Sequence, residues 1–215
     1  MKTTQRVLMI SAVILSLTIA LSMMFCAGCW TALHLYDGGF SRFIEAEEKQ
    51  LRYKLISGAT AWVDTEEGSD RHLQLLQIYN THEPLARGYE VTAADNWCAA
   101  FGSMVAIEQN LTDIIPTECG CERQIELWKS IGRWVEDDHY MPLTGDYIYY
   151  NWNVSFNFDE NNGWADHVGI VTGTAGPMIK VIEGNKDDRV TYRILYRGDY
   201  RIRGYGIPDY SSKTS

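Results

Sequence analysis

The stretch Asp166–Asn185, DHVGIVTGTAGPMIKVIEGN, decides the fold of this chain. Apolar residues alternate with polar or small ones over residues 166–173 and again over residues 177–184. Residues 174–176 join the two segments, and a proline follows them. Alternation on both sides of a Gly/Pro turn is typical of a β-hairpin. The stretch therefore predicts two antiparallel strands.

This hairpin is expected to bring a histidine and an acidic residue together. If Gly173 lies opposite Pro177, then His167 lies opposite Glu183, with Cβ atoms roughly 5 Å apart. Asn185 follows two residues later on the same face of the strand. A register shifted by two residues would place Asn185 opposite His167 instead. A histidine held by a carboxylate is half of a nucleophile-activating triad.

Cys98, in the segment ADNWCAAF, is the candidate nucleophile. Asp95 or Asn96 is expected to cap a helix, which would place Cys98 in its first turn. Free N–H groups and the helix dipole stabilise a thiolate there. An unperturbed thiol, with a pKa of about 8.5, is mostly protonated at neutral pH. The alternative is a small buried hydrophobic residue, but the hairpin in the same chain favours catalysis.

The rest of the chain predicts an α+β fold, because helices come first and antiparallel strands follow. The expected helices are Ser57–Asp64, Ser69–Tyr79, Trp97–Asn110 (buried on one side) and Gln124–Trp134. The expected strands, besides the hairpin, are residues 146–152, 188–196 and 201–208.

An uncharged apolar stretch, Val7–Gly28, follows Lys2 and Arg6. About 20 apolar residues can span a bilayer, so we expect a transmembrane anchor or, alternatively, a cleaved signal peptide. Lipid attachment at Cys29 is a third alternative. The basic start favours a cytoplasmic N-terminus and an exported body. The expected organisation is a signal peptide or anchor at 1–36, a tether or juxtamembrane helix at 37–54, one domain at 55–211 and a tail at 212–215.

Charge and cysteine content exclude several kinds of protein. The formal net charge is −9, and such a chain repels nucleic acids and anionic membrane surfaces. Beyond the N-terminal stretch, Cys98, Cys119 and Cys121 are an odd number, so no disulfide framework is expected. Cys119 and Cys121 lack the spacing of a zinc site. We interpret them as part of a loop that shapes a cleft wall, with a strained disulfide between them as the alternative, and we expect no metal or cofactor.

Several motifs in a fixed order resemble those of the CHAP domain family, the cysteine, histidine-dependent amidohydrolases/peptidases. The motifs are PLARGY, WCAAF, DIIPTECGC, GDYIYY, DHVGIV, IEGN and RGYGIP, and the resemblance covers about residues 55–211. It implies a papain-like fold, with N-terminal helices packed on an antiparallel sheet, and cleavage of amide bonds in peptidoglycan. It also implies Cys98 as nucleophile, His167 as base, Glu183 as the group that orients His167, and Asn185 as an additional polar member.

The resemblance leads to an exported peptidoglycan hydrolase, either an endopeptidase or an N-acetylmuramoyl-L-alanine amidase. We expect the protein to act as a monomer. Trp97 and Trp164 are candidate substrate-binding residues, although tryptophans are at least as often core residues. His72 and the other remaining histidines are expected to be solvated or capping residues. Two other functions stay open: a cysteine protease or amidase on a non-wall substrate, and a wall-binding module without turnover.

Overall fold

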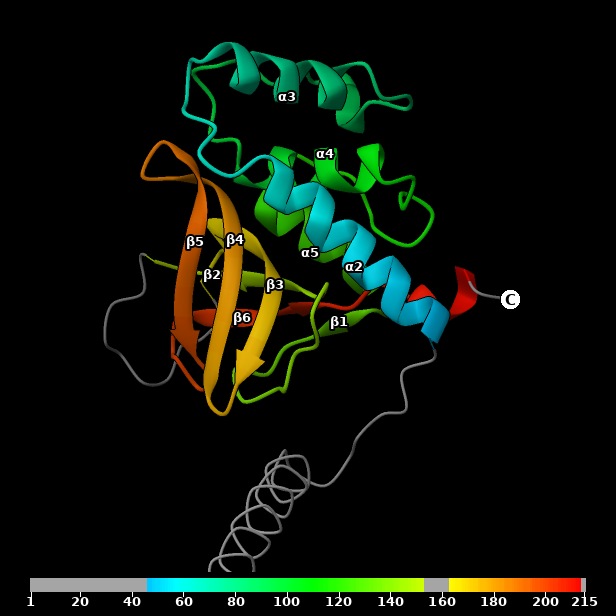
Figure 1. The fold of residues 1–215 in the computed structure, drawn as a ribbon, viewed down its shortest axis with the longest axis vertical. Helices are drawn as coiled ribbons and strands as arrows, with labels where there is room; N and C mark the ends of the chain where they lie inside the picture. Colours follow the sequence, from blue (N-terminus) through cyan, green and yellow to red (C-terminus); the bar gives the residue numbers. More distant parts are fainter. Residues whose placement is uncertain (1–45, 153–162, 214–215) are drawn as a thin grey trace, which may run out of the picture. The chain divides into compact units, whose positions relative to one another are not determined.

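The computed structural model describes residues 46–152 and 163–213 of the chain (Figure 1). The apolar stretch Val7–Gly28 and Cys29 lie outside these residues. Within them, no helix has the length and apolar character that crossing a membrane requires. All of them belong to one unit, Ile44–Ser215.

Helices precede strands, as expected for an α+β fold, and the six strands of the described residues form a single sheet. In the described residues the helices are α2 (Ala46–Ala61), α3 (Asp70–Asn80), α4 (Cys98–Glu108) and α5 (Cys121–Ser130), with short 3-10 turns η1 (Ala86–Gly88) and η2 (Tyr210–Lys213). The strands are β1 (Trp134–Val135), β2 (Tyr147–Tyr150), β3 (His167–Ala175), β4 (Met178–Lys186), β5 (Arg189–Tyr196) and β6 (Ile202–Gly206). All pairings are antiparallel, in the order β1-β6-β2-β3-β4-β5.

Helix α2 begins earlier than the sequence predicted, and its first buried residue is a charged one, Arg52. Its buried residues include Arg52, which donates hydrogen bonds to Asp146 at 3.0 Å and to Glu48 at 2.9 Å. A buried arginine paired with a buried carboxylate gives no signal in apolar periodicity. Residues 46–54, expected in a tether or juxtamembrane helix, are helical and join the domain through Arg52.

Helix α3 begins where predicted, since Ser69 accepts a hydrogen bond from the backbone N–H of His72 at 3.2 Å. Of the two roles expected for His72, solvated or capping, the solvated one was wrong. Its ring is fully buried, lies 4.5 Å from the ring of Trp97, and accepts a hydrogen bond from the N–H of Gly68 at 3.0 Å. His72 is a core residue.

Helix α4 is the centre of the helical layer and is buried on every side, not on one side as expected. Each residue from Cys98 to Ala106 is buried. The helix contacts α2, α3 and α5 as well as strands β3 and β4. Gly184 in β4 permits the close approach, because a Cβ there would lie 2.5 Å from the Cβ of Phe101. This packing brings the start of α4 to the hairpin.

The hairpin β3–β4 forms as predicted, but with a different register. Ala175 pairs with Met178, so the turn is the two-residue segment Gly176-Pro177. The backbone at Gly176 has φ of +57°, which favours glycine. A β-bulge after Val171 then shifts the pairing. Period-two alternation does not reveal a bulge, so the predicted pairing of Gly173 with Pro177 was wrong.

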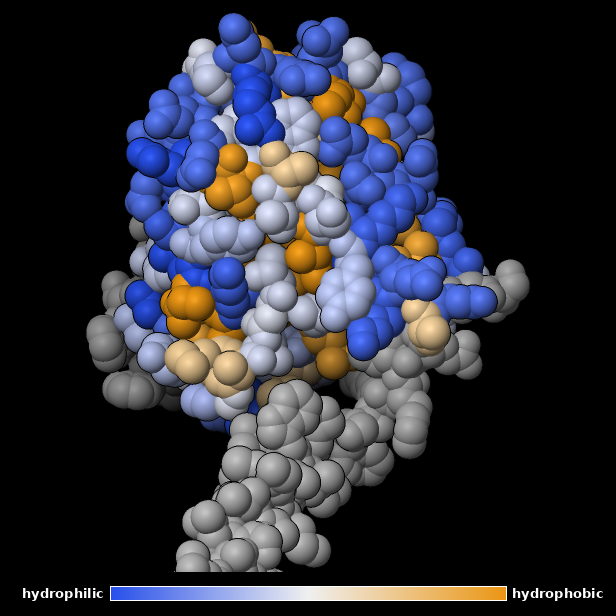
Figure 2. Space-filling model, in the orientation of Figure 1, coloured by the Kyte–Doolittle hydropathy of each residue, from blue (hydrophilic) through white to orange (hydrophobic). Residues whose placement is uncertain are grey.

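The two faces of the sheet are covered differently. The helices lie on one face (Figure 1), and the opposite face carries a second apolar cluster. That second cluster consists of Ile148, Tyr150, Val171, Ile179, Val181, Leu195, Ile202 and Tyr205. Figure 2 shows small separate hydrophobic groups on a mostly hydrophilic surface. The exposed apolar side chains of the β4–β5 pair are Met178, Ile194 and Tyr196.

Candidate active site

Cys98 is the first residue of α4 and lies in the first turn, as predicted. The predicted capping residues were wrong, since the N-cap is Trp97 and no side chain caps the helix. The carboxylate of Asp95 instead accepts hydrogen bonds from the N–H and hydroxyl of Thr92, at 2.8 and 2.7 Å. These bonds hold the turn before the helix. The N–H groups of the first turn therefore stay without a side-chain cap beside the Cys98 sulfur.

The thiol of Cys98 is held in an environment that favours its thiolate. A hydrogen bond with Cys121 lowers the pKa of Cys98 most strongly, and burial opposes this shift. A hydrogen bond with His167, attraction to its positive charge and a hydrogen bond from the backbone N–H of Val168 lower the pKa further. The pKa of Cys98 is thereby held well below its ordinary value.

His167 contacts Glu183 as predicted, although the backbone register that led to this prediction was wrong. Its Nε2 lies 3.1 Å from Oε2 of Glu183. Ile170 pairs with Ile182, so on the His167 side of the bulge the strands follow the register shifted by two residues, the alternative that the sequence left open. In that register Glu183 lies diagonally across from His167 and reaches it past Gly169. A Cβ on Gly169 would lie 2.8 Å from Cγ of Glu183. The missing side chain at Gly169 therefore allows this contact.

The charge of His167 complements that of Cys98. Burial lowers the pKa of His167, but hydrogen bonds and charge attraction from Cys98 and Glu183 outweigh it and raise the pKa to about 10. Because Nε2 faces Glu183, Nδ1 is the atom left for Cys98. The geometry therefore supports a thiolate–imidazolium pair at neutral pH.

Arg193 is a further member of the site that the sequence did not reveal. Its Nε donates to both carboxylate oxygens of Glu183, at 2.7 and 2.9 Å. Its guanidinium also lies 4.4 Å from the ring centroid of Trp152. The Glu183 side chain is 0% exposed, and a buried carboxylate needs such a partner. The need of Glu183 for a cationic partner was the one signal in the sequence that pointed to an arginine. It did not identify Arg193, because β5 also contains Arg189.

Asn185 does not join the His167 contact in this structure. Its backbone lies in the left-handed region with φ of +57°. Its side-chain Nδ2 donates to Oδ1 of Asn96 at 3.3 Å. Asn185 thus links the end of β4 to the segment that precedes Cys98. Of the four predicted residues, the structure joins Cys98, His167 and Glu183.

The two tryptophans predicted to bind substrate differ sharply. Trp97 is fully buried, and its Nε1 donates to Glu67 at 2.9 Å. The prediction for Trp97 was therefore wrong, since it is a core residue under α3. Trp164 is 76% exposed and precedes Ala165, whose N–H donates to Glu122 at 2.9 Å. Its role in substrate binding stays a prediction.

The cysteines near the site are free thiols. Cys121, the first residue of α5, has its Sγ 3.6 Å from Sγ of Cys98. Cys119 instead contacts Arg87 and the carboxylate of Glu118, at 3.1 and 3.4 Å. The alternative of a disulfide between Cys119 and Cys121 was therefore wrong. The sequence missed the contact between Cys121 and Cys98.

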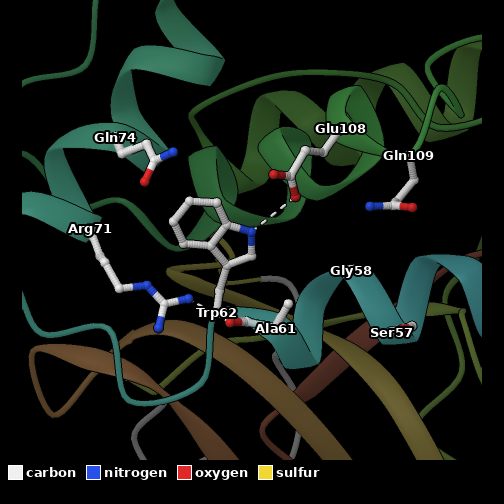
Figure 3. A pocket seen from close by; sticks show the side chains of 8 residues that line it. All are labelled: Ser57, Gly58, Ala61, Trp62, Arg71, Gln74, Glu108 and Gln109. Carbon is white, nitrogen blue, oxygen red and sulfur yellow. Dashed lines mark hydrogen bonds between the residues drawn. The ribbon is translucent and has the colours of Figure 1, made fainter.

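A cavity of about 560 Å³ lies between α2, α3 and α4 (Figure 3). In it Trp62 Nε1 donates to Glu108 at 2.9 Å, and Arg71 lies over the Trp62 ring with its Cζ 5.2 Å from the centroid. None of the site residues lines this cavity. The cavity therefore lies apart from the candidate site, which stays with Cys98.

A possible set of metal ligands occurs elsewhere in the described ranges, 46–152 and 163–213. Donor atoms of Asp137, Asp138 and His139 lie within 4.8 Å of one another. Asp137 and His139 are exposed, and none of the three belongs to the Cys98 site.

The comparisons with known proteins give a distant structural likeness only. No family model matches the chain, and no curated protein matches it. Similar solved structures include "The crystal structure of Ly7917 with the hydrolyzing product of MDP", with a TM-score of 0.43 and 12% identity. "The crystal structure of Ly7917" has a TM-score of 0.36 and 14% identity. Each match covers 73% of this chain and 62% of the Ly7917 chain.

Proposed function

We propose that the protein is a cysteine hydrolase that cleaves amide bonds of peptidoglycan. The observation that carries the hydrolase part is the arrangement of Cys98, His167 and Glu183. A low-pKa thiol touches a histidine, and a buried carboxylate orients that histidine. This is the arrangement of a nucleophile, an acid–base group and an orienting group in acyl transfer.

The first half of the proposed reaction uses the ion pair directly. The Cys98 thiolate attacks the carbonyl carbon of the scissile amide, and the carbonyl oxygen takes the negative charge. The backbone N–H of Cys98, at the start of α4, is the first donor to this oxyanion. His167 then gives its proton to the leaving nitrogen, the C–N bond breaks, and a thioester to Cys98 remains.

The second half releases the acyl group with water. His167, now neutral, takes a proton from a water molecule as that water attacks the thioester. The C–S bond breaks, the product leaves as a carboxylic acid, and the thiolate–imidazolium pair is restored. Glu183 stabilises the imidazolium and holds the ring orientation throughout.

The substrate class follows from the motifs, not from the reacting groups. WCAAF, DHVGIV and IEGN resemble CHAP domains, and these motifs contain Cys98, His167 and Glu183. The helix that carries the nucleophile packs against an antiparallel hairpin, the arrangement that a papain-like fold would have. With the apolar stretch Val7–Gly28, the resemblance favours work on the cell wall outside the cytoplasm, as an anchored or secreted protein.

A zymogram against purified cell wall tests this function. Wild type is expected to clear the wall, and Cys98→Ser is expected to leave it intact. Cys119→Ser is a matched control that removes a neighbouring thiol without touching the reacting atoms. Equal clearing by wild type and Cys98→Ser would contradict the proposal. Cleavage of peptides without clearing of intact wall would instead favour a protease on another substrate, and a wall-binding module would bind without clearing.

A further inference from the structure

The thiol of Cys121 faces the nucleophile from a second helix. Cys98 begins α4 and Cys121 begins α5. Their sulfur atoms lie 3.6 Å apart, and both side chains are buried. A disulfide bond would be about 2.05 Å long, so the two sulfurs meet as a thiol pair. At this distance one sulfur can donate its proton to the other.

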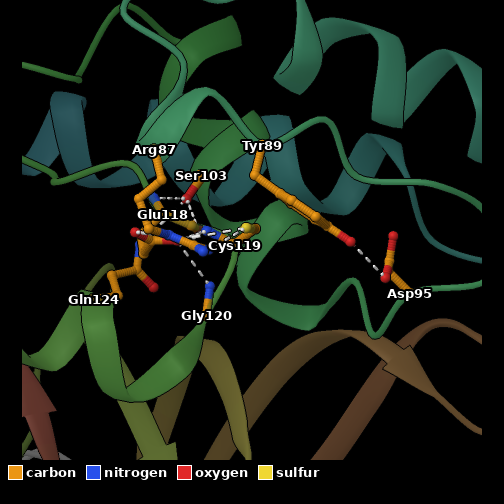
Figure 4. A network of polar contacts seen from close by, with 8 residues as sticks. All are labelled: Arg87, Tyr89, Asp95, Ser103, Glu118, Cys119, Gly120 and Gln124. Atoms are coloured by element: carbon orange, nitrogen blue, oxygen red, sulfur yellow. Dashed lines mark hydrogen bonds and ion pairs between the residues drawn. The ribbon is translucent and has the colours of Figure 1, made fainter.

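A buried network fixes the loop before Cys121 relative to α4 (Figure 4). The hydroxyl of Ser103 in α4 donates to the carbonyl of Glu118 at 2.7 Å and accepts from its N–H at 2.9 Å. The carboxylate of Glu118 accepts from Arg87 at 2.8 Å and from the N–H of Gly120 at 3.2 Å. The start of α5 is therefore held against the nucleophile helix.

The side chain of Gln124 ties the same network to the sheet. Its amide nitrogen donates to the Ser103 hydroxyl at 3.3 Å and to the carbonyl of Pro116 at 2.8 Å. Its amide oxygen accepts from the hydroxyl of Tyr149 at 2.9 Å. Each of these bonds joins α5 to α4, to the loop or to β2, so the position of Cys121 is set by buried contacts on three sides.

The charged and titratable groups around the pair decide which sulfur keeps its proton. His167 from β3 contacts Cys98, so the negative charge is stabilised there. The hydrogen bond with Cys98 raises the pKa of Cys121 most strongly, and burial, the charge of Cys98 and the charge of Asp166 raise it further. Tyr149 from β2 lies close enough to both sulfurs to feel their charge, and burial keeps its hydroxyl protonated. Cys121 therefore stays a neutral donor.

We propose that Cys121 is a further catalytic residue, whose S–H donates a hydrogen bond to the Cys98 thiolate in the resting enzyme. This inference rests on the proposed function only in taking Cys98 as the nucleophile. The bond is present while sulfur carries the charge and weakens when Cys98 becomes a thioester. A donor to a thiolate raises the thiolate fraction and lowers its intrinsic nucleophilicity. Its effect is thus to extend the reaction to lower pH.

The test is the pH profile of Cys98 alkylation by iodoacetamide in the full chain, followed by mass mapping of the Cys98 peptide. Cys121→Ala is expected to move the acid midpoint upward by about one pH unit. Cys121→Ser, which keeps a donor, is expected to restore part of the shift. Cys119→Ser, the matched control, is expected to leave the midpoint unchanged. A Cys121→Ala profile that superimposes on wild type, or an equal shift in Cys119→Ser, would overturn the inference.

A measurement on wild type keeps the inference testable if Cys121→Ala fails to fold. Diamide takes one proton and one electron from each of two thiols, and its N=N bond becomes a hydrazine. Peptide mass mapping after diamide treatment is expected to show a Cys98–Cys121 disulfide. A disulfide between Cys98 and Cys119, or an unpaired Cys98, would overturn the contact. Neither measurement uses the wall substrate. A protein that passes both but clears no wall therefore contradicts the proposed function and leaves the Cys121 contact standing.

Discussion

Glu183 reaches His167 across Gly169, and the two side chains meet at 3.1 Å although their backbones are not directly opposed. The space above Gly169 is filled by Cγ1 of Val181 and Cγ of Glu183. The contact between His167 and Glu183 was expected from a direct cross-strand pair, but it depends instead on the absence of a side chain at Gly169.

Gly169→Ala is expected to displace Glu183 and lower activity by more than tenfold, because the new Cβ would lie 2.4 Å from Val181 and 2.8 Å from Glu183. Overpacking of this kind costs about 1–3 kcal/mol. Wall-clearing rate and thermal unfolding are the measurements. The control is Gly173→Ala in the same strand, where a Cβ meets no atom within 4 Å. Full activity in Gly169→Ala would show that the contact of Glu183 with His167 does not need the free space above Gly169.

The pH dependence of hydrolysis is expected to be a broad plateau. The pKa of Cys98 is lowered and that of His167 is raised to about 10, so thiolate and imidazolium coexist between these two values. Activity should fall at the basic end, near pH 10, because His167 then has no proton for the leaving nitrogen. The measurement is kcat/KM against pH, and a basic limb near the ordinary histidine pKa of about 6.5 would contradict the ion pair.

Glu183→Gln is expected to move that basic limb to lower pH. The carboxylate favours the protonated form of His167, so its loss lowers the histidine pKa. The amide keeps the shape of the side chain, which makes the substitution a test of charge. The same kcat/KM profile checks it, with thermal unfolding as the control for folding. An unmoved basic limb in a folded variant would mean that Glu183 does not act on His167 electrostatically.

Arg193→Met is expected to destabilise the fold by about 3 kcal/mol, because the fully buried Glu183 carboxylate then loses one of its two cationic partners and keeps only His167. Denaturant unfolding measures this loss. Arg189→Met in the same strand is the control, since Arg189 bonds only weakly to the carbonyl of Asp187, at 3.4 Å. Equal stabilities of the two variants would show that Glu183 does not depend on Arg193.

Substitutions of Trp164 and Trp97 are expected to have different effects, because Trp164 is predicted to bind substrate and Trp97 is a core residue. Trp164→Ala removes an exposed ring and should raise KM with little change in unfolding. Trp97→Ala empties a buried site and should cost about 3–5 kcal/mol of stability. An unchanged KM in Trp164→Ala would exclude the predicted contact with substrate.

The sequence predicted the parts of this molecule that depend on local patterns. The hairpin and the start of α3 after its N-cap Ser69 follow from alternation and from helix-terminus composition. Cys98 lies in the first turn of α4 as predicted, although the capping residues on which that prediction rested were wrong. The bulge after Val171 could not be predicted, because it depends on how two strands meet. The contacts of Arg193 and Cys121 also join segments far apart in the chain, so no local spacing marks them.

The most direct test of the account is mass spectrometry of muropeptides released from purified peptidoglycan in H₂¹⁸O. Wild type is expected to give products with a new amine and a new carboxyl group that carries one ¹⁸O atom, since water hydrolyses the thioester to Cys98. Cys98→Ser is expected to release none of these products. Release of the same products by Cys98→Ser, or products without a new carboxyl group, would contradict a cysteine-dependent amide hydrolase.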